Sequence, residues 1–316
     1  MADDLVLFSE NEEGLQHMIT ILEKYCKENH LLVNTKKTKV MVFNKNGRLL
    51  LRRFVLNNTQ LEVVRSYKYL GFVITPSGEF TTGMKDLRDR AFRAFMKIKG
   101  DLGTSFNQDI PLSLSLFDTL IKPILLYASD FWGCFKMKKS NPIETFYMRI
   151  LKQILGVQKQ TTNTGVLLEL GRCPLSVEAI RLSIKNWERI RMGKANPLLL
   201  AAYKDSMKEK LPWVNSIKSI LERNGLLSLY RGSYPSKPPF VFKKISQRLT
   251  DVFHQESFES MRGEKIKLRT YALIKKTNWP SCTILARNHQ GLENREERVC
   301  PFCPQSIEDE AHFLLS

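Results

Sequence analysis

The chain begins with the stretch MADDLVLFSENEEG (residues 1–14), in which two adjacent carboxylates, Asp3 and Asp4, precede an apolar run at residues 5–8. Carboxylates presented close together are the ligands that a two-metal site requires. Neighbouring residues on a regular strand point to opposite faces of the sheet, so this pair can serve one site only at a turn. Taken alone, the dipeptide fits a frayed acidic terminus better than a metal site.

The segments that follow predict a small mixed sheet backed by one helix. Residues 11–30 place apolar side chains at helical spacing, and residues 39–43 and 67–75 have the composition of strands. Turn signals lie between these strands, at residues 44–47 and at the pair Asn57 and Asn58. With the apolar run at residues 5–8 as an opening strand, these elements form one compact α+β unit.

Beyond residue 80 the pattern becomes helical. Apolar stripes at helical spacing cover residues 84–102 and 142–155, and a longer apolar helix over residues 112–132 is interrupted by Pro123. Helical patterns continue to about residue 280, with a Pro/Ser-rich linker at residues 234–239 and a weaker break at Asn196-Pro197. The predicted fold class is therefore α+β, with a small sheet and helix at the N-terminus followed by a predominantly α-helical region.

Composition indicates a folded protein that seeks a polyanion. The 316 residues are 43% apolar, and 49 Lys and Arg against 32 Asp and Glu give a net charge of +17. Nucleic acid is the leading partner, although a lysine-rich surface also serves solubility alone. We expect no membrane partner and an intracellular location, nuclear or cytoplasmic, because no apolar stretch approaches a membrane span and no secretory signal is present.

Four features in one order carry a family resemblance: the Asp pair in ADDLVLFS (residues 2–9), an amphipathic helix, LLVNTKKTKVMVF (31–43) and RSYKYLGFVIT (65–75). This order resembles the end of the palm of reverse transcriptases from LINE-type, non-LTR retrotransposons. The resemblance implies an aspartate pair that binds Mg²⁺, a lysine that neutralises or protonates the departing pyrophosphate, and a hairpin that grips the primer. The catalytic residues would be Asp3, Asp4, Lys37 and Lys39, and the primer-binding residues Tyr69, Leu70 and Gly71.

Each of these assignments has a simpler alternative. The lysines fit a solvated loop nearly as well, and the Tyr-Leu-Gly segment fits an ordinary hairpin whose aromatic side chains pack the sheet. In the functional interpretation, Tyr69 and Gly71 would let a tight hairpin approach the primer backbone, Gly71 because it lacks a side chain.

The resemblance extends along nearly the whole chain. The segments at residues 121–133, 146–157 and 166–182 look like the thumb and the helical region after it, and RVCPFCPQSIEDEAHFLL (298–315) looks like a zinc knuckle. We therefore predict a partial palm at 1–80, a thumb-like region at 81–165, a helical linker region at 166–292 and an incomplete zinc knuckle at 293–316. Cys300, Cys303 and His312 supply three Zn²⁺ ligands, so we expect weak occupancy without a fourth.

Two groups of basic residues are candidates for contact with nucleic acid. The first lies on the helix that follows residue 80, and the second lies near the aromatic residues after position 240. Each group also fits a solvated helix face, which is the default for charged helices. The candidates are Arg88, Arg90, Arg93 and Lys97 in the first group, and Lys243, Lys244 and Arg248 in the second.

The resemblance implies a fragment of an RNA-directed DNA polymerase that binds an RNA template and a DNA primer, with dNTP as the only small-molecule substrate of the full-length enzyme. By comparison with the family, we expect these 316 residues to lack the fingers, the nucleotide-binding segment and the strand ahead of Asp3, and small errors in positioning cost orders of magnitude in rate. We therefore expect the isolated chain not to polymerise, and whether it is an enzyme stays open. The alternative is a non-enzymatic nucleic-acid-binding remnant of a mobile element.

Overall fold

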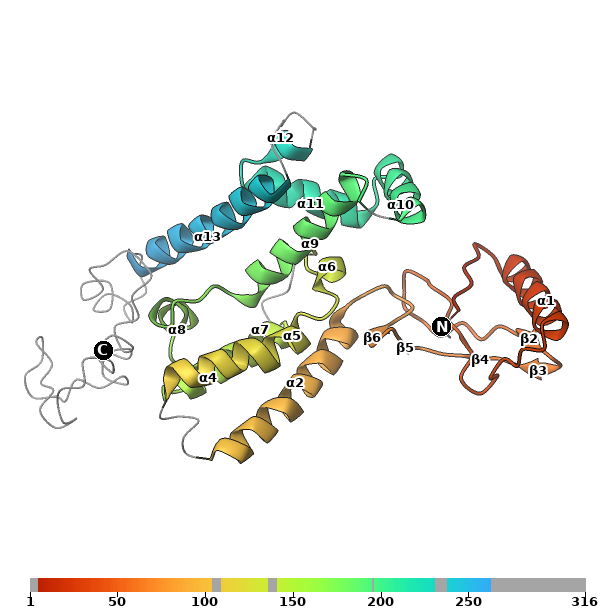
Figure 1. Cartoon of the computed structure of the whole chain (residues 1–316), viewed down its shortest axis with the longest axis horizontal. Helices are drawn as coiled ribbons and strands as arrows, with labels where there is room; N and C mark the ends of the chain where they lie inside the picture. Colours follow the sequence, from red (N-terminus) through yellow and green to blue (C-terminus); the bar gives the residue numbers. More distant parts are fainter. Residues whose placement is uncertain (1–4, 104–108, 136–140, 195, 231–237, 263–316) are drawn as a thin grey trace, which may run out of the picture. The chain divides into compact units, whose positions relative to one another are not determined.

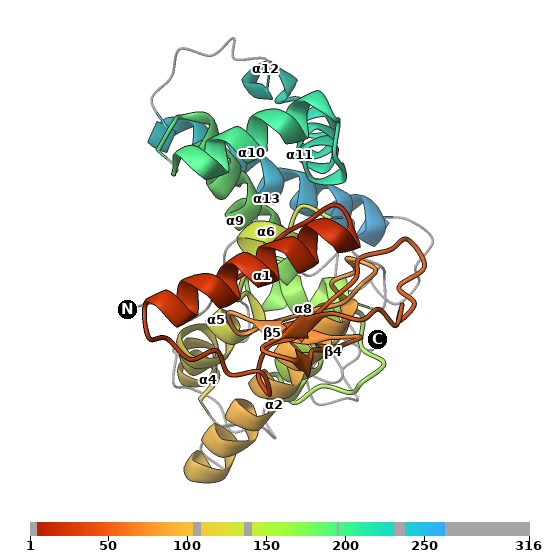
Figure 2. The same cartoon turned by 90° about the vertical axis from the view of Figure 1, so that its right-hand side faces the viewer.

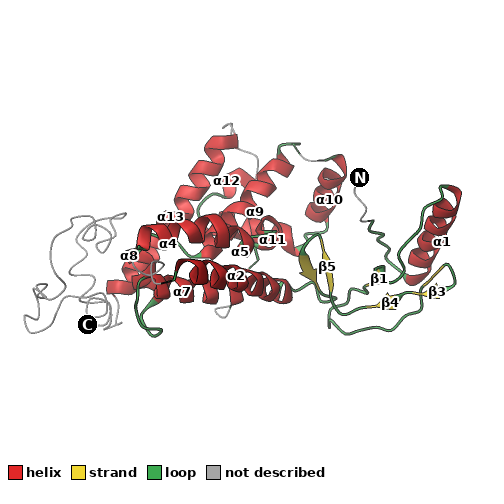
Figure 3. Cartoon of the chain, turned by 60° about the horizontal axis from the view of Figure 1, so that its bottom comes forward, coloured by secondary structure: helices red, strands yellow, loops and turns green. Residues whose placement is uncertain are grey.

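The computed structural model describes residues 5–103, 109–135, 141–194, 196–230 and 238–262. The chain divides into two compact units, Met1–Asp86 and Leu87–Ser316, and the division falls within helix α2 (Thr81–Leu102). Among the described residues, every strand lies in the first unit and the second is built from helices (Figures 1 and 3). The predicted α+β class is therefore confirmed.

Helix α1 (Glu12–Glu28) forms one side of the first unit (Figure 2). It starts at Asn11, whose side chain accepts a 2.7 Å hydrogen bond from the Gly14 amide and satisfies a free N–H of the first turn. Gln16 ties the helix to strand β2 by donating to the Val55 carbonyl and accepting from the Val55 amide, both at 2.9 Å. The small core between helix and strands contains Ile19, Val40, Phe54, Leu56 and Leu61.

The strands form three separate two-stranded ladders, so the prediction of one mixed sheet is wrong. Residues 5–8 are irregular chain, with Leu5 and Phe8 65% and 79% exposed, because a strand needs both a partner and a buried face. The strand predicted at residues 39–43 is only two residues long. The ladders are β1 (Lys39–Val40) parallel to β4 (Glu62–Val63), β2 (Val55–Leu56) antiparallel to β3 (Thr59–Gln60), and β5 (Tyr67–Tyr69) antiparallel to β6 (Phe72–Ile74).

The helix predicted over residues 112–132 is broken into four short pieces. Pro123 has no N–H to donate to the carbonyl of Thr119, and just before it the Lys122 amide bonds the Phe117 carbonyl, so the chain widens into a π-helix. Ala128 then turns into the left-handed region at φ 57°, which ends the run. The pieces are α4 (Ile110–Leu116), η1 (Phe117–Ile121), α5 (Lys122–Leu125) and α6 (Ser129–Trp132).

The remaining helices are arranged around α9, which contacts α6, α7, α10, α11 and α13 (Figure 1). Trp187 and Ile184 of α9 are completely buried at the centre of this cluster. Asn141 and Asn196 each stand before a proline and cap a helix start, so Asn196-Pro197 marks a helix rather than a linker. The helices are α7 (Pro142–Ile154), α8 (Asn163–Glu169), α9 (Leu175–Arg191), α10 (Pro197–Lys208), α11 (Pro212–Arg223), α12 (Leu227–Tyr230) and α13 (Pro238–Arg262).

The predicted domain boundaries can be compared with the division of the two units and with the ends of the helices. The boundary between residues 80 and 81 is close to the division of the two units, whereas that between 165 and 166 falls inside α8. The boundary at 292 and most of the predicted linker at 234–239 lie outside the described residues. None of the described helices combines the length and apolar content that a bilayer crossing requires.

Helices α6 and α9 approach each other so closely that their backbones touch. A methyl group added at Gly133, directly after α6, would lie 2.2 Å from the Ala179 carbonyl oxygen and 2.5 Å from that of Ser129. The Ser183 hydroxyl donates a buried 2.7 Å hydrogen bond to the Ser129 carbonyl across the same crossing. Small residues at this crossing therefore set the distance between the two helices.

Candidate functional site

The predicted metal ligands lie outside the part of the chain that the structure describes. This holds for Asp3 and Asp4 and for the zinc-knuckle residues Cys300, Cys303 and His312. Within the described ranges, no three His, Cys, Asp or Glu side chains gather as a metal-binding group. Binding of Mg²⁺ and of Zn²⁺ therefore stays a prediction.

The structure distinguishes the two predicted catalytic lysines. Lys39 lies on β1, and its ammonium is 2.5 Å from a carboxylate oxygen of Glu62 on the neighbouring strand β4. Lys37 is exposed at a turn in which Asn34 accepts its amide, and it has no ion pair with any described residue. A lysine already neutralised by a carboxylate is a poor partner for pyrophosphate. Lys37 is thus the better candidate of the two.

Tyr69, Leu70 and Gly71 form the tip of the β5–β6 hairpin. Tyr69 pairs with Phe72, which leaves Leu70 and Gly71 as a two-residue turn with φ values of 45° and 82°. Two positive φ angles define the turn type that matches the twist of paired strands, and Asn or Gly usually occupies its first position. Leu70 is 60% exposed there, so an apolar side chain is held in a strained conformation at the tip.

The first predicted basic group lies on α2, and its members differ in surroundings. Arg88 donates two hydrogen bonds to Asp89, and the Arg90 guanidinium lies 5.9 Å from the centre of the Tyr127 ring. Arg93 and Lys97 are exposed, one turn apart on the same face. Beside them lie Phe92 and Met96, which are 42% and 48% exposed.

The second predicted basic group lies on α13. Lys243 is exposed, and the side chain of Lys244 is outside the described part. Arg248 donates through Nε to the carbonyl of Asn224, which follows α11, at 3.3 Å. Part of the Arg248 guanidinium therefore closes a helix end, which reduces its capacity for phosphate.

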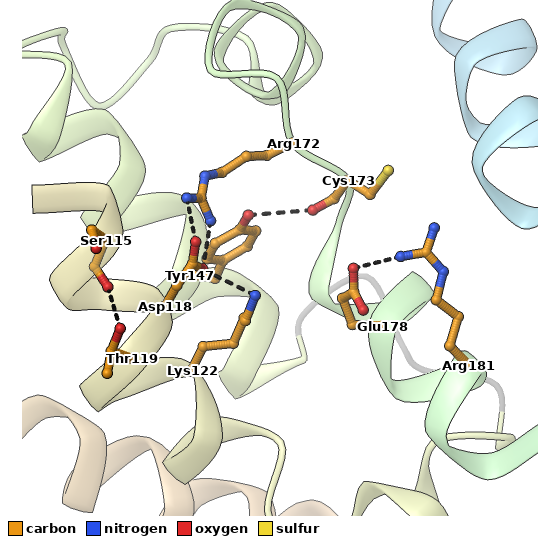
Figure 4. Close-up of polar contacts among 9 residues, drawn as sticks. All are labelled: Ser115, Asp118, Thr119, Lys122, Tyr147, Arg172, Cys173, Glu178 and Arg181. Carbon is orange, nitrogen blue, oxygen red and sulfur yellow. Dashed lines mark hydrogen bonds and ion pairs between the residues drawn. The ribbon is translucent and has the colours of Figure 1, made fainter. Parts of the chain in front are cut away.

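A partly buried charge cluster that sequence reasoning missed ties η1 to the loop between α8 and α9 (Figure 4). Arg172 donates two hydrogen bonds of 2.8 and 2.7 Å to the carboxylate of Asp118, and the Lys122 ammonium lies 3.0 Å from the same carboxylate. Tyr147 donates to the Cys173 carbonyl at 3.3 Å beside them. Burial alone would raise the pKa of Asp118, but Arg172 and Lys122 outweigh it and lower that pKa.

A second partly buried carboxylate, that of Glu144 on α7, binds the start of α9. It accepts the amides of Leu175 and Ser176 at 3.3 and 3.0 Å, where the first turn of a helix has unused N–H groups. Burial raises the pKa of Glu144 to about 7, although both amide bonds favour the charged form. Asp118 and Glu144 are each an acidic residue within an apolar helical stretch. That pattern is the sequence signal for carboxylates that connect one helix to another segment.

Comparison with known proteins relates the chain to reverse transcriptases. Residues 1–74 match the family described as reverse transcriptase (RNA-dependent DNA polymerase). An uncharacterized transposon-derived protein of Caenorhabditis elegans is 29% identical over 161 residues, which are 49% of this chain and 55% of that protein. A protein of Drosophila melanogaster named probable RNA-directed DNA polymerase from transposon BS is 22% identical over 197 residues, 60% of this chain and 22% of that protein.

The chain therefore spans about half the length of one of these relatives and about a fifth of the other. No solved structure matches it. The matches support a reverse-transcriptase-like protein related to transposons.

Proposed function

We propose that the chain is the C-terminal part of an RNA-directed DNA polymerase of a LINE-type, non-LTR retrotransposon, and that it holds an RNA template paired with a DNA primer. The observation that carries the proposal is the Tyr69-Leu70-Gly71 turn, which lies within the residues that match the reverse transcriptase family. A tight turn with a glycine allows close approach to a nucleic-acid backbone.

In this proposal Asp3 and Asp4 would hold Mg²⁺, which would supply positive charge for the primer hydroxyl and the triphosphate. Lys37 places its ammonium beside the pyrophosphate that leaves. Cys300, Cys303 and His312 bind Zn²⁺ as part of a structural knuckle. Arg93 and Lys97 neutralise phosphates of the duplex, and Phe92 and Met96 add apolar contact.

The affinity of the full chain for an RNA–DNA template-primer should fall steeply with salt. If basic residues of α2 and α13 neutralise about four phosphates, raising the salt threefold should weaken binding about 50-fold. Fluorescence anisotropy with a labelled duplex measures this. The double variant Arg93→Ala/Lys97→Ala should reduce the slope of log affinity against log salt concentration by the amount expected for about two phosphate contacts.

The matched control is Lys204→Ala/Lys208→Ala, which removes two exposed charges with the same spacing from α10. It removes the same net charge, so only a specific role of α2 distinguishes the two double variants. Equal losses for both, or binding that does not respond to salt, would contradict the assignment.

The substitution Leu70→Asn should stabilise the hairpin and weaken binding of the template-primer. Asn tolerates a positive φ better than Leu, so the turn should gain about 1 kcal/mol, measured as slower hydrogen exchange of the β5–β6 amides. Loss of the exposed leucine should weaken binding about fivefold if it contacts the primer. Leu51→Asn is the control, because Leu51 is 79% exposed in the same unit. It should leave the stability of the hairpin and the affinity for the template-primer unchanged.

A second candidate function is nucleic-acid binding without synthesis. It is favoured by the basic residues of α2 and α13, because both helices lie outside residues 1–74. Primer extension with dNTPs and Mg²⁺ separates the two functions. Templated synthesis that Asp3→Ala abolishes supports the polymerase. Salt-sensitive binding with no extension is the result expected of the isolated chain, and it supports nucleic-acid binding without synthesis by this chain alone.

A further inference from the structure

A cavity of about 690 Å³ in the second unit has chemistry that the reverse transcriptase motifs do not account for. Residues of α6, α9 and α13 line it. Helices α6 and α13 both contact α9 (Figure 1). Much of its wall is apolar, formed by Leu126, Leu182, Met192 and Phe242. A cavity of this size and polarity suits a ligand of nucleotide size with a flat apolar part.

Two deeply buried polar groups of this wall lack hydrogen bonds. Ser129 is 1% exposed and Glu188 is 4% exposed, and both line the cavity. Neither the Ser129 hydroxyl oxygen nor Oε1 of Glu188 has a hydrogen-bond partner among the described residues. A buried carboxylate oxygen without a donor is costly, so the cavity calls for a ligand that brings N–H groups.

The cations around the cavity suit an anionic part of the same ligand. Lys185, Arg189 and Lys194 line it, against the acids Asp130 and Glu188. The Lys185 ammonium lies 5.8 Å from the centre of the Phe242 ring, which places a positive charge beside an aromatic surface. Burial also raises the pKa of Glu188, while Arg191 and Lys194 oppose this shift.

These three properties together exclude simpler ligands. An inorganic anion would leave the apolar wall and the carboxylate without a partner, and a fatty ligand would leave the cations unused. A nucleotide matches all three, since its base is flat, its exocyclic amine donates N–H bonds and its phosphates are negative. Uracil and thymine match less well, because carbonyl groups flank their single ring N–H.

We propose that this cavity binds one base of a single-stranded RNA or DNA, with preference for a base that carries an amino group. Glu188 and Ser129 accept hydrogen bonds from the base edge, Phe242 and Met192 contact its face, and Lys185, Arg189 and Lys194 bind the adjacent phosphates. The site goes beyond the proposed polymerase function, because it reads bases through the helical unit and requires no synthesis.

The test is fluorescence anisotropy of the full chain with labelled single-stranded RNA homopolymers of eight adenines, cytosines or uracils at one salt concentration. Oligo(A) and oligo(C) should bind about tenfold more tightly than oligo(U), the effect expected of one hydrogen bond to a charged acceptor. Glu188→Gln should abolish this preference by weakening binding of oligo(A) and oligo(C). Lys185→Ala should weaken binding of all three homopolymers equally. It should also reduce the slope of log affinity against log salt concentration by the amount expected for about one phosphate contact.

Matched variants separate the site from general effects. Glu222→Gln removes an exposed carboxylate from α11 and should change nothing, and Lys218→Ala on the same helix is the control for Lys185→Ala. Glu188→Gln removes a buried charge without a hydrogen bond, so its melting temperature should not fall. If that variant nevertheless unfolds, Ser129→Ala is the second probe and should reduce the preference about threefold.

Equal affinity for the three homopolymers in the wild-type chain would overturn the base site. So would an unchanged preference in Glu188→Gln. Either result together with steep salt dependence would leave the electrostatic binding of the proposed function intact, so the two proposals fail separately.

Discussion

Gly133→Ala is expected to lower the free energy of unfolding of the helical unit by about 3 kcal/mol, the upper range for forcing volume into a packed core. The added methyl would lie 2.2 Å from the carbonyl oxygen of Ala179, and backbone atoms within α9 cannot move aside as a flexible side chain would. Separating the helices would also break the buried bond from Ser183 to Ser129.

Gly100→Ala is the matched control, because nothing lies within 4 Å of a methyl group added at this position of α2. Alanine favours a helix over glycine, so this variant should gain about 0.5–1 kcal/mol. Urea unfolding followed by tryptophan fluorescence reports on the helical unit alone, since all four tryptophans follow residue 86. A loss below about 1 kcal/mol for Gly133→Ala would show that the crossing relaxes easily.

The tight turns of the first unit can be predicted from sequence because their conformations demand particular residues. Asn57 and Asn58 both adopt positive φ between β2 and β3, and Gly71 does so after Leu70. Helix starts follow the same logic, since an asparagine before a proline supplies both the cap and a fixed φ. The helical spacing of apolar residues likewise predicted α1 and α2 from the sequence alone.

The breaks of the central apolar run could not be predicted in the same way. Pro123 signals an interruption, but whether the chain kinks, widens or stops depends on what packs around it. Here the π-helix places Asp118 toward Arg172, which lies far away in sequence. The spacing of apolar residues therefore predicts a helix that contains Pro123. Whether the helix kinks, widens or ends there is decided by tertiary contacts.

Contacts between residues far apart in the sequence could not be predicted either. Lys39 appears equivalent to Lys37 in the sequence, and only the pairing of β1 with β4 brings Glu62 to its ammonium. Likewise, Ser129 and Glu188 line one cavity because α6 contacts α9. No spacing rule joins residues in different helices, so sites of this kind require the fold.

Arg172→Met is expected to destabilise the helical unit by about 3 kcal/mol, because it leaves the partly buried carboxylate of Asp118 without its two strongest hydrogen bonds. Lys122 still faces that carboxylate, which places the loss at the lower end for a broken buried pair. Arg88→Met is the control, since its adjacent partner Asp89 is 52% exposed and such surface pairs contribute less than about 1 kcal/mol.

The double variant Asp118→Asn/Arg172→Met should lose less than the sum of the single variants, with a coupling of about 2 kcal/mol. The dependence on pH provides an independent check. Because the pKa of Asp118 is lowered from 3.8 in the folded state, its contribution is present above pH 3.8 and is lost as the pH falls below that value. The Arg172→Met variant should therefore lose less stability than the wild-type chain over this acid range. Parallel curves for the two proteins would mean that Asp118 and Arg172 are not coupled.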